Sequence, residues 1–157
     1  MANRPREPPT HDATTDGEYR LRPGAKALVT TGSTVLLVKE RHADGTPFWT
    51  LPGGGVHDGE TLGEGLRREL DEELHCRARV GRPVTEFWYA HESLDATVSA
   101  YTVFDCDLLS PVTPDATEGI LDARWVRPSA VPPTTLPQVR HVCRHETAVP
   151  AAASAGD

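Results

Sequence analysis

Three glutamates close together in the sequence are of the type that binds a hard metal ion, namely Glu69, Glu72 and Glu73. On a helix that advances about 100° per residue, Glu69 and Glu73 lie about 40° apart, and Glu72 lies about 60° from Glu69 on the other side. Like charges at this spacing repel one another, and a single nearby guanidinium, Arg68, cannot neutralise three carboxylates. A divalent cation with oxygen ligands is the natural remaining partner, so the spacing predicts a magnesium site.

A run of three glycines, Gly53, Gly54 and Gly55, precedes these carboxylates. Where side chains are absent, backbone carbonyls and amides can approach a metal ion or a phosphate closely. Each feature alone has an ordinary alternative, because an acidic helix face is usually a solvated surface and a glycine run is usually a tight turn. Taken separately, the two features leave both interpretations open.

A helix over residues 62–74 is predicted to carry the carboxylates. Thr61 and Glu64 have the spacing of a capping box, which satisfies backbone amides at a helix start. Apolar residues then recur at every fourth position, as Leu62, Leu66, Leu70 and Leu74. Glu73 falls beside this apolar stripe, whereas Asp71 projects about 160° away from Glu73 and is expected to be solvated. The helix therefore separates the candidate metal ligands from an ordinary surface acid.

The rest of the chain predicts a sheet and a second helix. Apolar β-prone runs occur at residues 25–29, 34–38, 48–51, 78–89, 97–108 and 123–126. Extended structure is expected to end at Pro52, with a flexible glycine loop after it. Three prolines, at positions 132, 133 and 137, favour a helix start near residue 136, and this helix is expected to run to about residue 147.

Composition limits the class of protein. A length of 157 residues fits one domain, expected over residues 19–147, with disordered segments at 1–18 and 148–157. The net charge of -7 argues against a stable nucleic-acid partner, which usually requires a basic face. Three cysteines without a Cys-x-x-Cys pair indicate reduced thiols. No apolar run is long enough to cross a bilayer, so we expect a cytoplasmic protein that does not bind membranes.

The order Gly54, five residues, Glu60, seven residues, then Arg68 followed by Glu-Leu-Asp-Glu-Glu resembles the signature of the Nudix hydrolase family. Chance agreement at so many fixed positions is rare, and the match therefore outweighs the solvated-surface alternative. The resemblance implies an α/β fold, the Nudix fold, in which a mixed β-sheet is sandwiched between helices. One departure is His75, where the family usually has a glycine. If this position caps the helix in a left-handed conformation, histidine costs about 1 kcal/mol of stability there.

The family resemblance also implies the activity and the roles of the motif residues. It implies Mg²⁺, with Mn²⁺ as an alternative, and metal-activated attack of water on phosphorus in a nucleoside diphosphate linked to another moiety. The implied metal ligands are Glu69, Glu72, Glu73 and the carbonyl of Gly53, and Arg68 and Glu60 orient them. Glu69 is the first candidate for the general base, and Glu118 in a later loop is an alternative.

The substrate is expected to contact Gly54 and Gly55 through its phosphates and an aromatic shelf through its base. Trp49 is the first candidate for this shelf, with Phe87, Trp88 and Tyr89 as others, although each is more often a core residue. Which nucleotide derivative is cleaved stays open, and a homodimer is allowed. Two alternatives remain: a module that binds a nucleotide with little turnover, and an RNA 5′-end pyrophosphohydrolase.

Overall fold

The computed structural model describes residues 19–91 and 96–147. The disorder predicted for residues 1–18 and 148–157 lies outside the described residues. The described part contains seven β-strands, two α-helices and two short 3₁₀ helices. In chain order these are β1 (Arg20–Thr31), β2 (Thr34–Arg41), β3 (Pro47–Thr50), β4 (Gly53–Gly55), α1 (Leu62–Leu74), β5 (Ala78–His91), β6 (Thr97–Leu108), η1 (Ala116–Glu118), β7 (Asp122–Val126), η2 (Pro128–Ala130) and α2 (Pro137–Glu146).

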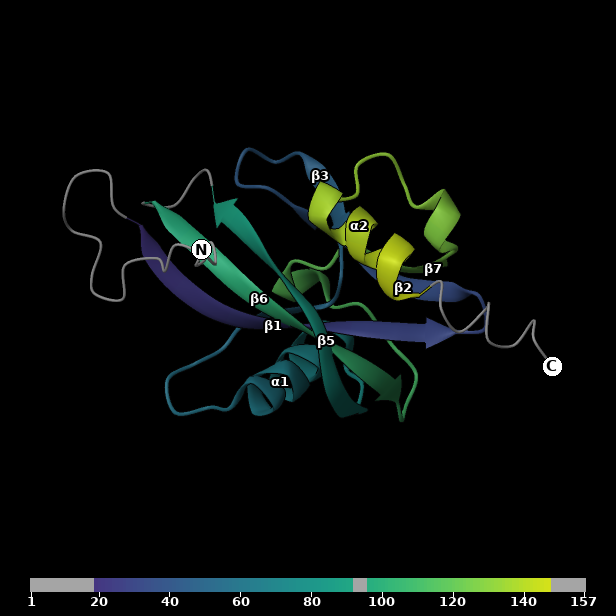
Figure 1. Ribbon diagram of the computed structural model, residues 1–157, viewed down its shortest axis with the longest axis horizontal. Helices are drawn as coiled ribbons and strands as arrows, with labels where there is room; N and C mark the ends of the chain where they lie inside the picture. The colour runs from purple at the N-terminus through teal and green to yellow at the C-terminus, as the bar shows by residue number, and fades with distance from the viewer. Residues whose placement is uncertain (1–18, 92–95, 148–157) are drawn as a thin grey trace, which may run out of the picture.

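The strands form one mixed sheet with the order β3-β2-β1-β6-β5, as Figure 1 shows. The central pair, β1 and β6, is parallel, and its register runs from Arg20 opposite Thr97 to Val29 opposite Cys106. The other pairings are antiparallel, and β4 and β7 add to β1 and β2, respectively. The sheet is therefore mixed, as the family resemblance implied.

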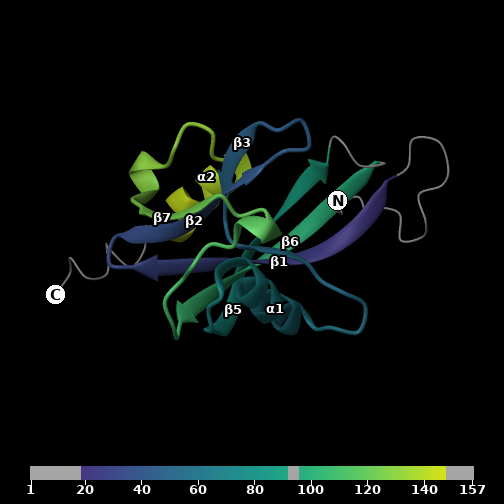
Figure 2. The ribbon, with the colours of Figure 1, turned by 180° about the vertical axis from the view of Figure 1, so that it is seen from behind.

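Two apolar clusters fill the space between the sheet and the helices. On one side, α1 packs its leucines against inward residues of β1 and β2, including Val29 and Leu36. On the other side, α2 packs Val139 and Val142 against residues such as Val103. Figures 1 and 2 show the two helices on opposite sides of the sheet. The predicted fold class, a mixed sheet sandwiched between helices, is confirmed.

The glycine run differs from the prediction. We expected extended structure to end at Pro52 and a flexible loop to follow, but Gly53–Gly55 forms β4 and pairs antiparallel with β1, with Gly53 opposite Lys26. The prediction of a flexible loop is therefore wrong. At Gly53 the two backbones come so close that a side chain would clash with the carbonyl oxygen of Ala25, so glycine permits this strand pairing.

Within the described ranges, no helix is long and apolar enough to span a membrane.

Candidate active site

The glycines of β4 bring its backbone close to β1 and to the carboxylate of Glu69 in α1. Gly53 has φ +128°, and a Cβ added there would lie 2.2 Å from the carbonyl oxygen of Ala25. A Cβ on Gly54 would lie 2.8 Å from Oε1 of Glu69. Both distances are shorter than real Cβ contacts, so only glycine fits at these positions without a shift of the neighbours. Gly53 thus permits the close approach of β4 to β1, and Gly54 leaves room for the Glu69 carboxylate.

Helix α1 begins as the sequence predicted. The Thr61 side chain accepts a hydrogen bond from the amide of Glu64, and the Glu64 carboxylate accepts one from the amide of Thr61. The helix ends at His75, which has φ 50° and ψ 40° and is the expected left-handed cap. The side chain of His75 lies 2.8 Å from Asp115, the residue that precedes η1. The departure from the family glycine is thus accommodated without loss of the helix end.

Arg68 is the centre of the acidic cluster. Its Nε donates to Glu60 at 2.7 Å, and its Nη1 donates to Glu69 and to Glu72, both at 3.0 Å. Its Nη2 donates to the carbonyl oxygen of Gly55 at 3.0 Å. One guanidinium therefore joins β4, the loop that follows it and two carboxylates of α1. Arg68 and Glu72 are four residues apart, the spacing at which side chains on one helix face meet.

The charges of this network are fixed by their hydrogen bonds. Those from Arg68 and from the backbone amide of His57 lower the pKa of Glu60 to about 2. The hydrogen bond to Glu60, reinforced by Glu69, raises the pKa of Arg68 above its ordinary value. Glu60 is therefore an anion and Arg68 a cation across the physiological pH range.

Glu73 is the buried carboxyl group of α1. Only 7% of its surface is exposed, and its carboxylate accepts a hydrogen bond of 3.1 Å from the amide of Gly53. Burial raises the pKa of Glu73 to about 9; Lys26 acts in the opposite direction, and Glu40 and Glu69 add to the rise. In the absence of a further cation, burial therefore favours the protonated form of Glu73.

Lys26 lies between β4 and the carboxylates and was not predicted as a site residue. It is 4% exposed, and its Nζ donates to the carbonyl oxygen of Gly53 at 2.9 Å and lies 4.7 Å from the centre of the Tyr101 ring. Burial lowers the pKa of Lys26, but the nearby Tyr101, Glu40 and Glu73 groups outweigh it, and the net shift is upward. The lysine is thus a buried cation beside the proposed metal ligands.

The donor atoms fit a hard divalent cation in type, because all are carboxylate or carbonyl oxygens. Their present arrangement is different: within the described ranges, no three His, Cys, Asp or Glu side chains stand together as a group that could hold a metal ion. The Nη1 atom of Arg68 is 3.0 Å from both Glu69 and Glu72, and Glu73 bonds to Gly53 instead. Arg68 contacts only Oε2 of Glu69 and Oε1 of Glu72, so the second oxygen of each carboxylate can turn to a cation while the guanidinium holds the first.

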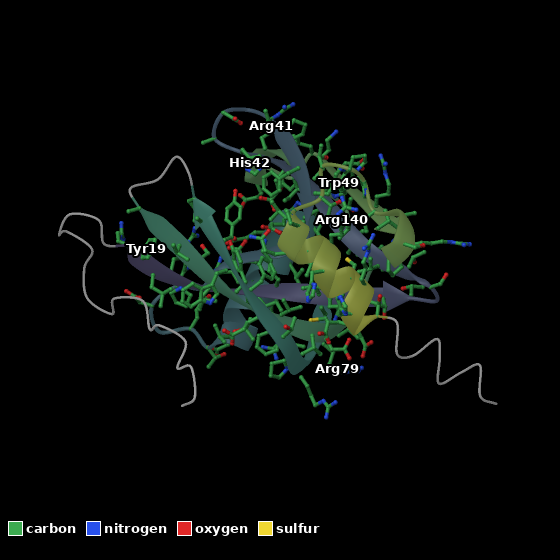
Figure 3. The ribbon with its side chains drawn as sticks, turned by 45° about the horizontal axis from the view of Figure 1, so that its top comes forward. Tyr19, Arg41, His42, Trp49, Arg79 and Arg140 are labelled. Atoms are coloured by element: carbon green, nitrogen blue, oxygen red, sulfur yellow. The ribbon has the colours of Figure 1, made fainter. Side chains whose placement is uncertain are left out.

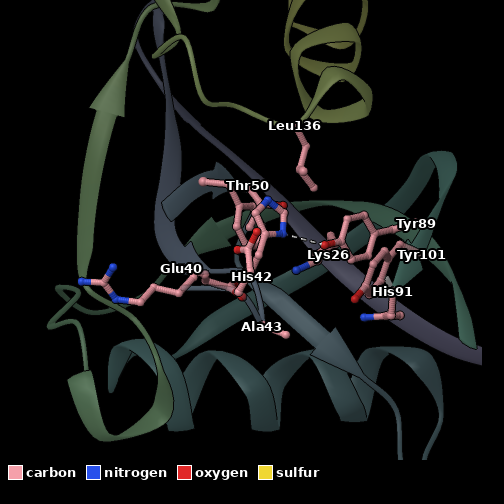
Figure 4. Close-up of a pocket in the computed structure, with 12 residues that line it drawn as sticks. Lys26, Glu40, His42, Ala43, Thr50, Tyr89, His91, Tyr101 and Leu136 are labelled. Carbon is pink, nitrogen blue, oxygen red and sulfur yellow. Dashed lines mark hydrogen bonds between the residues drawn. The ribbon is translucent and has the colours of Figure 1, made fainter. Parts of the chain in front are cut away.

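A pocket of about 360 Å³ opens beside this cluster (Figure 4). Lys26 is in its wall, which connects the pocket to Gly53 and the acidic helix. Its other lining residues come from β2, the β2–β3 loop, β3, β5, β6 and the N-cap of α2: Glu40, Arg41, His42, Ala43, Asp44, Phe48, Thr50, Tyr89, His91, Tyr101 and Leu136.

The structure brings most of the predicted site residues together. Those in one cluster are Gly53, Gly54, Gly55, Glu60, Arg68, Glu69, Glu72 and Glu73. Two others lie apart. Trp49, labelled in Figure 3, is 4% exposed and packs in the α2-side core. It does not line the pocket. Glu118 is exposed on η1, which contacts α1.

Sequence reasoning missed most of the pocket. Of the predicted aromatic shelf, Tyr89 lines it, whereas Phe87 is in the core and Trp88 is 41% exposed. One usable signal was present: Lys26 interrupts the apolar run at 25–29, and a charge in a buried strand is rare unless it is paired.

Comparisons with known proteins agree on one family. The family model of the NUDIX domain matches residues 20–145. The chain is 31% identical over 116 residues to "Nudix hydrolase 6" of Arabidopsis thaliana, a match that covers 71% of this chain and 40% of that protein. It is 35% identical over 68 residues to "Nucleoside triphosphatase NudI" of Enterobacter sp. (strain 638). This match covers 37% of this chain and 47% of that protein. The chain thus spans less than half the length of these two relatives.

Among solved structures, the chain resembles the MutT NUDIX hydrolase from Burkholderia pseudomallei. The TM-score is 0.69 and the identity 20%, over 82% of this chain and 98% of the other. At this identity the likeness concerns the fold alone.

Proposed function

The chain belongs to the Nudix family, and we propose that it is a magnesium-dependent hydrolase that cleaves the phosphoanhydride bond of a nucleoside diphosphate linked to another moiety. The observation that carries the proposal is the cluster around Arg68, which joins Glu60, Glu69 and Glu72 and packs them against β4. A solvated acidic surface needs neither a shared guanidinium nor a backbone held within contact distance.

The proposed metal ligands are Glu69, Glu72, Glu73 and the carbonyl oxygen of Gly53. When bound, Mg²⁺ or Mn²⁺ would supply a Lewis acid that polarises phosphoryl oxygens and lowers the pKa of water. Arg68 and Glu60 keep the carboxylates of α1 in place through the hydrogen bonds described above. A site held by such supporting contacts needs less rearrangement at the moment of reaction.

In the proposed reaction, water attacks phosphorus in line with the bond to the leaving phosphate. The P–O bond then breaks, and the electron pair departs with the leaving oxygen, giving two phosphate products. Glu69 is the first candidate to take the proton from water, because it lies beside Gly54 at the centre of the cluster. Glu118 is the alternative, since η1 contacts α1.

The pocket beside the cluster is the proposed place for the rest of the substrate. Its volume of about 360 Å³ is at the lower end of the range for small-molecule sites. The phosphates would lie between the pocket and α1, near the backbone of Gly54 and Gly55. Tyr89 takes the place of Trp49 as the proposed aromatic contact, because Tyr89 lines the pocket and Trp49 does not.

The proposal also concerns the setting of the protein. Three free cysteines, all buried, fit a reducing cytoplasm. A nucleotide derivative is the proposed partner; neither a membrane nor a stable nucleic-acid complex is part of the proposal, and a homodimer is compatible with it.

The test is hydrolysis of a substrate panel by purified protein with Mg²⁺. The panel contains nucleoside triphosphates, ADP-ribose, dinucleoside polyphosphates, nucleotide sugars and triphosphorylated RNA. The wild type should release phosphate products from at least one of them. The Glu72→Gln variant should lose most of this activity, whereas the Asp71→Asn control, on the exposed side of α1, should keep it. Ligand binding without turnover by the wild type would favour a binding module, and cleavage of RNA alone would favour an RNA pyrophosphohydrolase.

A further inference from the structure

Two buried oxygen atoms in the pocket have no hydrogen-bond partner among the residues that the structure describes. They are Oε2 of Glu40 and Oγ1 of Thr50, and both residues line the pocket. A third such atom is Oγ1 of Thr135. Thr135 does not line the pocket, but the next residue, Leu136, does. Buried polar atoms in proteins are nearly always bonded. The atoms of Glu40 and Thr50 therefore indicate hydrogen-bonding capacity in this pocket that a ligand can use.

The same pocket has a flat aromatic wall. The rings of His42 and Phe48 are stacked with centroids 4.0 Å apart and planes 18° apart, and Tyr89 is nearly parallel to both. His42 and Tyr89 are also joined by a hydrogen bond of 3.0 Å, drawn as a dashed line in Figure 4. Fixed, near-parallel rings favour contact with a planar or flat-faced group.

Glu40 offers a carboxyl group to a ligand in this pocket. Burial raises its pKa, Lys26 acts in the opposite direction by favouring the ionised form, and Glu69 of the acidic helix adds to the rise. An ionised carboxylate has two acceptor oxygens and no donor. A ligand that donates to both oxygens also favours the ionised form and offsets the cost of burial. The matching ligand group is therefore one with two adjacent N–H or O–H donors.

We propose that Glu40 determines substrate specificity by accepting paired hydrogen bonds from two adjacent donors of the moiety in this pocket. This inference rests on the proposed function, because it names the substrate class of that site. Two kinds of nucleotide group offer such a pair: the ring N–H and amino group of guanine, and the vicinal hydroxyls of a ribose or other sugar. Adenine and cytosine present a donor next to an acceptor, and uracil presents one donor between two acceptors.

Binding of nucleoside monophosphates tests the proposal without requiring hydrolysis. Calorimetry compares GMP with IMP, which lacks the amino donor, and with dGMP, which lacks the diol. The wild type should bind GMP about tenfold more tightly than one of the two, the size expected for a lost bond of a bidentate pair. Weaker binding of IMP than of GMP assigns the pair of donors to guanine, and weaker binding of dGMP assigns it to the sugar.

The variants decide whether Glu40 is responsible. Glu40→Gln keeps the shape but replaces one acceptor with a donor, so it should abolish the tenfold preference. Glu86→Gln, on the exposed face of β5, is the matched control and should keep it. Thr50→Val should weaken GMP binding while the protein stays folded, as a thermal melt would confirm. Equal binding of all three nucleotides by wild type, no binding of any, or an unchanged preference in Glu40→Gln would overturn the proposal.

The outcome is separable from that of the proposed function. Preference for GMP that depends on Glu40, in a protein that hydrolyses nothing, would overturn the hydrolase and leave the specificity residue in place. Hydrolysis with the same substrate preference in wild type and Glu40→Gln would support the hydrolase and overturn the role of Glu40 in specificity.

Discussion

Replacement of Lys26 by methionine tests how the site holds its charges. Methionine has nearly the same length as lysine and fits a buried position, but it has no donor and no charge. In Lys26→Met, the carbonyl oxygen of Gly53 loses its hydrogen bond of 2.9 Å. The carboxylates of Glu40 and Glu73 lose the cation that lowers their pKa values.

The size of the effect follows from these two losses. A hydrogen bond from a charged donor contributes about 1.5–3 kcal/mol to stability. Removal of one partner from a buried ion pair costs about 3–5 kcal/mol. Part of the loss is offset, because methionine removes the cost of burying an ammonium group and because Glu73 can take up a proton. We therefore expect the free energy of unfolding to fall by about 2–4 kcal/mol, or about 5–15 °C in Tm.

The assay is urea unfolding in EDTA, repeated with excess Mg²⁺. Lys39→Met is the control, since Lys39 is a partly exposed lysine on the neighbouring strand β2. It should change stability by less than about 0.5 kcal/mol. Addition of Mg²⁺ should restore more stability to Lys26→Met than to the wild type, because the ion replaces the missing charge near the same carboxylates. A Lys26→Met protein as stable as the wild type in EDTA would refute this reasoning.

Three further predictions concern single residues of the site and its pocket. In EDTA, Glu73 has a pKa of about 9 against an ordinary 4.5, so the folded protein holds the proton more strongly, and stability falls as pH rises between these values. This fall is at most about 1.4 kcal/mol per pH unit and can be followed by urea titrations at several pH values. It should disappear in Glu73→Gln and persist in the control Asp71→Asn. Gly53→Ala would place a Cβ 2.2 Å from the oxygen of Ala25 at a φ of +128°, and calorimetric melts should show a loss of at least about 2 kcal/mol. Thr50→Val removes a buried hydroxyl without a partner, so the same melts should show no loss of stability and a gain of up to about 1 kcal/mol.

The carboxylate helix could be read from the sequence because its signals are local. The capping box at Thr61, the leucine spacing and the left-handed end at His75 all act within a few residues, and the structure confirms each of them. The contact between Arg68 and Glu72 follows from helix geometry in the same way. Local rules were enough to place the predicted acids on one helix.

The pocket could not be read from the sequence because it depends on long-range pairing. Lys26 reaches Gly53 only because β1 pairs with β4, and Tyr101 joins it through the parallel pairing of β1 with β6. The glycine run was predicted to be a loop for the same reason. Its partner residues lie far back in the sequence: Lys26, for example, is 27 residues before Gly53. The ring of Trp49 is of the kind that stacks on a nucleotide base, but its side chain is in the core. The amide of Leu136, at the start of α2, donates a hydrogen bond to the carbonyl oxygen of Trp49.

The central claim is that the acids of α1, together with Gly53, gather a hard divalent cation. Its most direct test is isothermal titration of Mg²⁺ and Mn²⁺ into folded protein, with and without GMP, for the wild type, the double variant Glu69→Gln/Glu72→Gln and Asp71→Asn. The account predicts saturable uptake by the wild type and by Asp71→Asn, and a loss of at least about tenfold in affinity in the double variant. Uptake that is absent from the folded wild type, or unchanged in the double variant, would contradict it.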